Sequence, residues 1–224
     1  MDITWLLFNK LTVSLNCSAV YLTGGSARDE LLGLEYNDFD FATGLSPDEL
    51  CRRLDILGWK NDYSFIKYGV VKTFVNSQRL TVASMRQELN YRDFRHPAEL
   101  KFVDDLTIDS KRRDFTVNAI YIDSKKNVSD PQNGMADLNS KVLRMIGDPE
   151  DRLYEDPLRI LRAIRFKNKY NFVYDKKLLD AIYHNLGMLN KLNPLKVKEE
   201  TGKFDDAAYL ELNSFLKERA NENH

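Results

Sequence analysis

The stretch that decides the fold is residues 24–29 (GGSARD), followed after a short gap by residues 38–40 (DFD). Because side chains alternate along a strand, two carboxylates separated by one residue point to the same face. Asp38 and Asp40 can therefore hold one divalent cation, or two close together. The glycine pair lets the backbone approach something bulky and anionic, such as a triphosphate. This combination predicts a metal-dependent nucleotidyl-transfer site near the N-terminus.

The composition describes an ordinary soluble globular protein. The 224 residues are 43% hydrophobic and 30% charged, enough for one large domain or two small ones. The formal net charge of -1 means that a nucleic-acid partner must meet a local basic patch. Cys17 and Cys51 alone argue against a disulfide framework. With no membrane-length apolar run and no signal-peptide pattern, we expect a cytoplasmic protein that does not bind membranes.

Hydrophobic periodicity predicts an α+β head followed by helices. A boundary near residue 148 separates a head at residues 1–147 from a helical segment at residues 148–224. The helical segment shows helical periodicity from Asp151 onward. The elements expected in the head are helices over residues 3–16, 27–34, 110–119 and one opening at Ser46-Pro47, strands over 19–22, 38–42, 100–103 and 120–122, a hairpin of 65–75 with 79–85, and a mobile loop over 91–99.

The two strand aspartates suit one particular reaction. Attack of a hydroxyl on an α-phosphate builds negative charge on both the attacking and the leaving oxygen. Two Mg²⁺ ions bridged by Asp38 and Asp40 stabilise that charge and lower the hydroxyl pKa. Arg28 can reach the triphosphate in this arrangement. The alternative interpretation is that Arg28 is a surface arginine of a helix, paired with Asp29.

A second motif is residues 112–119 (RRDFTVNA). On a helix, Asp114 and Asn118 are i,i+4 neighbours on one face, and together they suit the hydroxyls of a ribose. Arg113 adds a charge for phosphate. The alternative is a capped, solvated helix with Asp114 in its first turn.

A third motif is residues 155–165 (EDPLRILRAIR). Asp156 and Arg159 form a fork of acceptor and donor that can read the Watson–Crick edge of a free base. Arg162 and Arg165 extend the row and can grip phosphates. The alternative is a surface helix laced with salt bridges, although most arginines in this acid-poor stretch are expected to lack a nearby acid.

These motifs, in this order, resemble the class II tRNA nucleotidyltransferases, which are the CCA-adding enzymes, and the related bacterial poly(A) polymerases. The resemblance runs over residues 18–168. The matching residues are Gly24-Gly25 with Arg28-Asp29, Asp38 with Asp40, residues 112–119, Asp130-Pro131 with Gly134, Asp137 and Leu138, residues 155–159, and residues 162–166.

The resemblance implies a role for each matching residue. Asp38 and Asp40 would be catalytic metal ligands for Mg²⁺. Asp156 and Arg159 would pair with the base of the incoming CTP or ATP, so that protein instead of template selects the nucleotide. The triphosphate would be held by Gly24, Gly25 and Arg28, the ribose and phosphates by Arg113, Asp114 and Asn118, and the nucleotide would be positioned by Arg162 and Arg165.

The resemblance also implies a fold and a product. The fold is a nucleotidyltransferase head with a mixed β-sheet and flanking helices, then an all-helical neck. The product is CCA added to tRNA 3′ ends. The loop at residues 91–97, with Arg92 and Arg95, occupies the place of the family's flexible loop, and its presence argues against an enzyme that adds only CC. The alternative interpretation is a surface loop without a role in nucleotide addition.

One departure from the family pattern keeps other functions open. The chain stops about where the neck should end, so body and tail domains are expected to be absent and tRNA affinity to be reduced. A partner chain supplying them is one explanation. The alternatives are an A-adding or poly(A)-adding enzyme, an idle or split subunit that binds nucleotide or RNA, and nucleotidyl transfer to a small molecule, which leaves the pair Asp156 and Arg159 unexplained.

Overall fold

The protein is described by a computed structural model covering residues 3–17, 19–75, 78–91 and 97–222. Within these ranges the chain separates into two compact units. The head unit comprises Met1–Leu89, Glu99–Arg113 and Val117–Gly134. The helical unit comprises Asn90–Ala98, Asp114–Thr116 and Met135–His224. The domain boundary near residue 148 stays a prediction, and each unit is described below by itself.

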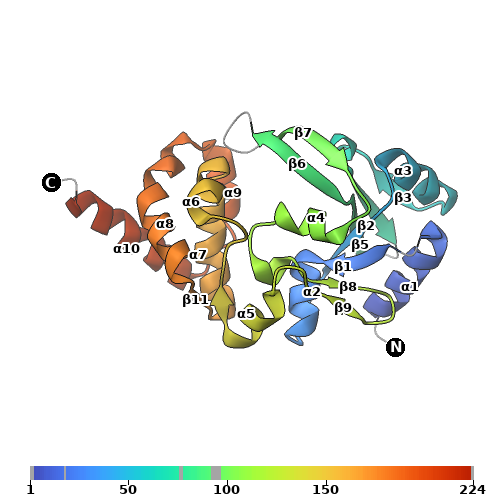
Figure 1. The fold of residues 1–224 in the computed structure, drawn as a ribbon, viewed down its shortest axis with the longest axis horizontal. Coiled ribbons are helices and arrows are strands. Elements are labelled where there is room, and N and C mark those ends of the chain that lie inside the picture. The colour runs from blue at the N-terminus through green and yellow to red at the C-terminus, as the bar shows by residue number, and fades with distance from the viewer. Residues whose placement is uncertain (1–2, 18, 76–77, 92–96, 223–224) are drawn as a thin grey trace. The chain divides into compact units, whose positions relative to one another are not determined.

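A mixed sheet forms the centre of the head unit (Figure 1). Across the described residues its strand order is β3-β4-β5-β2-β1-β8-β9. Strand β2 runs parallel to β5, whereas β1 is antiparallel to both β2 and β8. The strands are β1 (Val20–Thr23), β2 (Asp38–Thr43), β3 (Lys60–Asp62), β4 (Val70–Val75), β5 (Gln78–Ser84), β8 (Tyr121–Ile122) and β9 (Val128–Ser129). The hairpin predicted from the sequence pattern is confirmed in β4 and β5, and so is the mixed sheet that the family resemblance implies.

One helix of the head begins where the sequence places its cap, whereas the helix predicted over residues 27–34 begins and ends three residues earlier. Helix α3 (Pro47–Ile56) has proline at its first position, and the Ser46 hydroxyl accepts a hydrogen bond from the Glu49 N–H at 3.4 Å. Helix α2 (Gly24–Leu31) starts directly at the glycine pair. The other helical segments are α1 (Ile3–Leu15), η1 (Ile66–Tyr68), α4 (Leu106–Lys111) and η2 (Thr116–Asn118).

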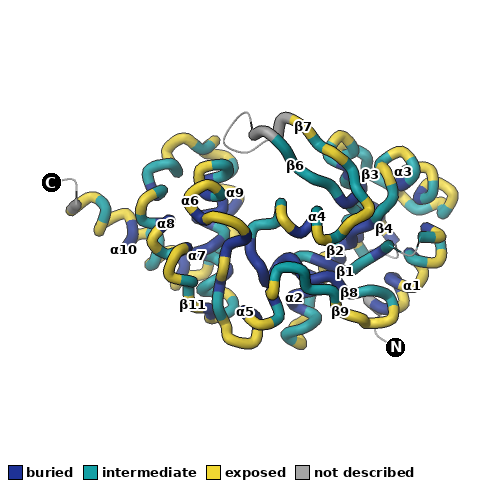
Figure 2. Tube along the Cα trace, in the orientation of Figure 1, coloured by how far each residue is buried: buried dark blue, intermediate teal, exposed yellow. Residues whose placement is uncertain are grey.

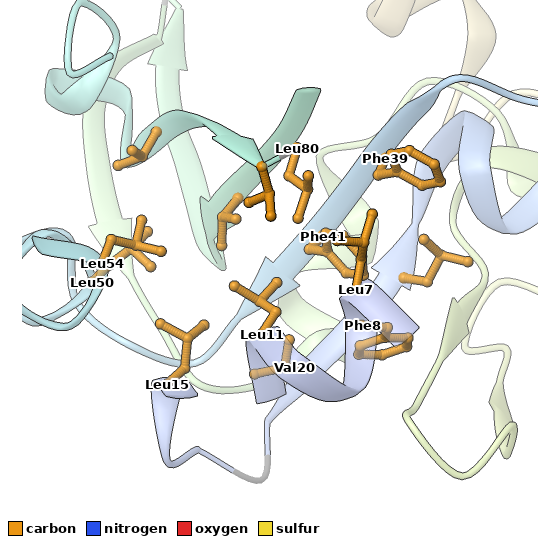
Figure 3. Close-up of a cluster of buried hydrophobic side chains, with 14 of the residues drawn as sticks. Leu7, Phe8, Leu11, Leu15, Val20, Phe39, Phe41, Leu50, Leu54 and Leu80 are labelled. Carbon is orange, nitrogen blue, oxygen red and sulfur yellow. The ribbon is translucent and has the colours of Figure 1, made fainter. Parts of the chain in front are cut away.

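The head core lies between the sheet and the helices α1 and α3. Figure 3 shows one face of β2 contributing Phe39 and Phe41 to this core, both almost fully buried. Because side chains alternate along the strand, burial of the two rings sends Asp38 and Asp40 to the opposite face. Figure 2 shows the same pattern as dark blue along much of β1, β2 and β8. The other labelled core residues are Leu7, Phe8, Leu11, Leu15, Val20, Leu50, Leu54 and Leu80.

The helix predicted over residues 110–119 is wrong. Helix α4 ends at Lys111, and only the short 3₁₀ turn η2 follows. Residues 114–116 instead lie alongside residues 144–146. The Ile146 N–H donates to the Asp114 carbonyl at 3.0 Å, and the Thr116 N–H donates to the Arg144 carbonyl at 3.0 Å. These strand-like bonds use the backbone groups that a helix would need, so tertiary pairing overrides the local helical preference.

Two further strand pairs of the described chain lie outside the seven-stranded sheet. Strands β6 (Arg86–Tyr91) and β7 (Pro97–Phe102) pair with each other. Residues 97–99 therefore belong to a strand instead of the predicted loop, while Arg92 and Arg95 lie outside the described residues. Strands β10 (Val142–Leu143) and β11 (Val173–Tyr174) pair in parallel.

The helical unit is built around α7 (Leu158–Tyr170). One side of this helix is buried through Ile160, Leu161, Ala163 and Ile164. The remaining helices are α5 (Gly134–Ser140), α6 (Pro149–Glu155), α8 (Lys176–Asn185), η3 (Leu186–Lys191), α9 (Pro194–Thr201) and α10 (Asp206–Glu222). Among the described residues, no helix combines the length and apolarity needed to cross a bilayer.

Candidate active site

The aspartate nearer the start of β2 is exposed and paired. The side chain of Asp38 is 66% exposed, and its carboxylate forms an ion pair with Arg79. Arg79 is the residue directly opposite Asp38 in the parallel β2–β5 register. The sequence did not indicate Arg79, because helix α3 and strands β3 and β4 separate β2 from β5 along the chain. Only the pairing of β2 with β5 brings Arg79 beside Asp38.

The second aspartate is more enclosed. Asp40 lies opposite Thr81 on β5 in the same register. Burial raises the pKa of Asp40, and the nearby charge of Arg113 opposes that rise. A desolvated carboxylate of this kind gains a counter-charge when a cation binds, which suits a ligand role.

The glycine turn borders this carboxylate. Gly24 has a φ of +64°, a left-handed conformation that favours glycine. A Cβ at this position would lie 3.6 Å from Asp40 Oδ2 and 3.7 Å from Arg113 Nη1. The backbone of the turn therefore lies against both a carboxylate and a guanidinium. Ser26 fixes the turn to β2, since its hydroxyl donates to the Asp38 carbonyl at 2.7 Å and accepts from the Asp40 N–H at 2.9 Å.

Arg28 is buried in the head instead of lying on its surface. It forms an ion pair with Asp29 at 2.8 Å, which confirms the pairing considered as the alternative for this residue. Its Nη1 also donates to Asn118 Oδ1 at 2.5 Å. A Cβ at Gly25 would lie 3.5 Å from Arg28 Nη2. The structure thus brings Gly25, Arg28 and Asn118 together, although 90 positions separate the last two.

Arg113 is held by a buried acid that the sequence did not single out. Its guanidinium pairs with Asp109 at 2.9 Å. Its Nε also donates to the Tyr121 hydroxyl at 2.9 Å, and its Nη1 donates to the Asn118 carbonyl at 3.2 Å. Burial by itself would raise the pKa of Asp109, but Arg112 and Arg113 outweigh it and hold that pKa well below its usual range. The signal for Asp109 was its i,i+4 spacing to Arg113.

Asp114 and Asn118 do not share a helix face, contrary to the prediction. In the helical unit, Asp114 Oδ2 accepts hydrogen bonds from Arg162 Nε at 2.8 Å and Nη2 at 2.5 Å. Asn118 belongs to the head unit, where it binds Arg28. The cause is the loss of helix between them described above.

The arginines of α7 are not short of acids, which corrects a second expectation. Arg162 has Asp114, and Arg165 pairs with Glu200 of α9 at 2.6 Å. Both acids come from distant parts of the sequence, so local composition could not show them. Arg159 is buried and paired with Glu155 at 3.2 Å, so the salt-bridged alternative describes this helix at least in part.

The other half of the predicted base-reading pair ends the preceding helix. Asp156 is the C-terminal residue bordering α6, and its carboxylate accepts from the Leu158 N–H at 3.1 Å. The Arg159 N–H donates to the Asp156 carbonyl at 3.0 Å. Asp156 and Arg159 therefore lie in one turn at the start of α7, as their spacing predicted.

The acids of the head suit a magnesium ion whose ligands come partly from the protein and partly from a bound substrate. No cluster of three or more His, Cys, Asp or Glu side chains suited to a metal occurs in the described parts of the chain. Another acid of the head, Asp105, is already engaged as the N-cap of α4, where its carboxylate accepts a hydrogen bond from the Thr107 N–H at 2.7 Å. Magnesium is commonly held by one or two carboxylates together with waters and substrate phosphates. Asp38 and Asp40 on one strand face meet that requirement.

Comparison with known proteins gives consistent matches. The family described as "Poly A polymerase head domain" matches residues 20–144. A CCA-adding enzyme of Lactobacillus helveticus is 36% identical over 180 residues, covering 80% of this chain and 44% of the relative. That of Streptococcus mutans is 38% identical over 177 residues, covering 77% and 42%. The chain thus spans less than half the length of these curated relatives.

Solved structures agree. The Bacillus stearothermophilus CCA-adding enzyme in complex with CTP has a TM-score of 0.79 at 27% identity, covering 91% of this chain and 49% of that one. A tRNA nucleotidyltransferase complexed with a primer tRNA and an incoming ATP analog has a TM-score of 0.71 at 27% identity, covering 98% and 61%.

Proposed function

Because this chain belongs to the family of the poly A polymerase head domain and the CCA-adding enzymes, we propose that it is a template-independent RNA nucleotidyltransferase. Its substrates in this proposal are CTP and ATP, and it adds C and A to the 3′ end of tRNA. Relatives with CTP or with primer tRNA and an ATP analog support this choice of nucleotide and acceptor. A cytoplasmic location belongs to the same proposal.

The head residues take the reacting phosphates in this proposal. Asp38 and Asp40 are the catalytic metal ligands. Magnesium bound there supplies charge stabilisation at the attacking and leaving oxygens and lowers the pKa of the attacking hydroxyl. Gly24, Gly25 and Arg28 hold the triphosphate through close backbone approach and a fixed guanidinium.

The remaining nucleotide contacts are proposed for residues on both sides of position 113. Arg113 and Asn118 contact phosphate and ribose, and both are held by the Asp109 and Arg28 bonds described above. Asp114 is proposed to contribute to the ribose site while bonded to Arg162. A side chain that is already held loses little conformational entropy on binding, which favours these roles.

The helical unit selects the base in this proposal. Asp156 and Arg159 present an acceptor and a donor to the Watson–Crick edge of CTP or ATP. Arg162 and Arg165 position the nucleotide, with Asp114 and Glu200 fixing their own orientation.

One observation carries the proposal. The carboxylates of Asp38 and Asp40 project from the same face of β2, and the positive-φ turn at Gly24 lies against Asp40 and Arg113. A pair of carboxylates beside a backbone turn and a guanidinium suits a metal-bound triphosphate.

Incorporation assays test the product. The chain is incubated with Mg²⁺ and tRNA ending at the discriminator base, at C or at CC, with labelled CTP and ATP supplied separately and together. Addition of CCA to the first substrate is the expected result. The family description also names poly(A) polymerase, and extension by A alone selects that second function. Absence of incorporation on every substrate overturns both and favours an idle or split subunit.

A further inference from the structure

The neighbours of the two aspartates on β5 are not acidic. In the parallel register, Asp38 lies opposite Arg79 and Asp40 lies opposite Thr81. Side chains directly opposite each other in a sheet share a face. The carboxylate of Asp38 and the guanidinium of Arg79 form an ion pair on that face, with 66% and 47% of their side chains exposed.

The carboxylate of Asp40 also has a guanidinium nearby, that of Arg113, but this guanidinium is paired with another acid. Arg113 is fixed by the buried Asp109 and is 12% exposed. Arg79 is half exposed and pairs directly with a proposed cation ligand. Of these two arginines, Arg79 is the one placed to compete with a cation for carboxylate oxygens and free to swing away.

We propose that Arg79 is a positioning residue that occupies the Asp38 carboxylate in the free chain and leaves it when a metal-bound triphosphate arrives. The inference rests on the proposed function, since it takes Asp38 and Asp40 as cation ligands. A guanidinium and a divalent cation attract the same oxygens and repel each other, so Arg79 lowers the affinity of the free chain for the cation. When a triphosphate accompanies the cation, its phosphate oxygens offer the released guanidinium a new partner.

This arrangement makes cation and nucleotide binding depend on each other. Without nucleotide, the cation must displace Arg79 from Asp38, and the released guanidinium gains no new hydrogen-bond partner. With nucleotide, the same displacement exchanges one charge-assisted hydrogen bond for another. The chain therefore binds metal and triphosphate together more readily than metal alone, and Arg79 sets the size of that difference.

Manganese titration followed by electron paramagnetic resonance of the free ion tests the proposal without turnover. The titration is made with the full chain, with and without a non-hydrolysable CTP analogue. Arg79→Gln is expected to bind Mn²⁺ alone about three- to tenfold more tightly than the unaltered chain. The nucleotide is then expected to strengthen Mn²⁺ binding less in the variant than in the unaltered chain.

Three matched variants guard the interpretation. Arg52→Gln removes an exposed arginine of α3 that pairs with Glu49, and its Mn²⁺ affinity is expected to be unchanged. Arg79→Lys keeps the charge and is expected to remain within about twofold of the unaltered chain. Adding Asp38→Asn to Arg79→Gln is expected to remove the gain in affinity.

The outcomes separate the two proposals. Equal or weaker Mn²⁺ binding by Arg79→Gln overturns the role of Arg79 and leaves Asp38 and Asp40 as cation ligands. Absence of Mn²⁺ binding by every variant, with nucleotide present, overturns the role of Arg79 and the proposed metal site together. Circular dichroism checks that each variant is folded.

Discussion

Arg162 and Asp114 lie 48 positions apart, yet two nitrogens of the Arg162 guanidinium bond the same carboxylate oxygen, at 2.8 and 2.5 Å. Asp114 is 10% exposed and Arg162 is 33% exposed, so the pair is largely shielded from water. The bond ties the 114–116 segment to α7. A residue expected to face the ribose is thereby shown to have a structural partner as well.

Removing the acid of this pair is expected to destabilise the helical unit. Asp114→Asn leaves a largely buried guanidinium without its counter-charge, and we expect the free energy of unfolding to fall by about 2–4 kcal/mol. Urea denaturation followed by circular dichroism measures the change. The double variant with Arg162→Met is expected to recover part of the loss, and a strictly additive double variant would contradict coupling between the two residues.

The strand aspartates are expected to control turnover and not folding. Asp38→Asn and Asp40→Asn are each expected to lower nucleotide incorporation more than about 100-fold, because each removes a cation ligand. Asp48→Asn, an exposed acid in the first turn of α3, serves as the control and is expected to leave activity unchanged. Retention of near-full activity by either strand variant would sink the metal-ligand assignment.

The buried Asp109 is expected to make stability depend on acid. Its pKa is lowered in the folded chain, so its contribution is present above the unfolded value of about 3.9 and is lost as pH falls below it. Asp109→Asn is therefore expected to cost most at neutral pH and progressively less on acidification. Unfolding free energies at several pH values between 7 and 3 measure this, and a pH-independent difference would contradict it.

Tyr121→Phe tests how Arg113 is held. The substitution keeps the buried ring and removes the hydroxyl bonded to Asp109 and Arg113. We expect a loss of about 1–2 kcal/mol in stability and a higher KM for nucleotide, since the guanidinium loses one of its restraints. Steady-state kinetics and denaturation measure the two effects. An unchanged KM would assign the hydroxyl to stability alone.

The pair at the start of α7 is expected to govern base choice. Arg159→Lys keeps the charge but loses the guanidinium fork, and we expect the preference for CTP and ATP over UTP and GTP to fall about 10- to 100-fold. Competition assays with mixed nucleotides measure the preference. Glu155→Gln disturbs the ion pair of Arg159 without changing the fork, and we expect it to preserve most of the selectivity.

Local sequence patterns are enough to predict the alternation of β2, the helix start at Ser46 and the shared turn of Asp156 and Arg159. These features depend on residues a few positions apart, so strand alternation, capping and helical geometry are enough to predict them. The family resemblance also predicted the mixed sheet, which the strand pairing confirms.

The partners of the charged and polar side chains depend on tertiary contacts. Asp38 meets Arg79, Arg28 meets Asn118, Asp114 meets Arg162, and Arg165 meets Glu200 only after strands pair and helices pack. The same pairing of residues 114–116 with 144–146 replaces a locally favoured helix. Charges find counter-charges through space and not along the chain, and no local pattern specifies a contact between residues 35 to 90 positions apart.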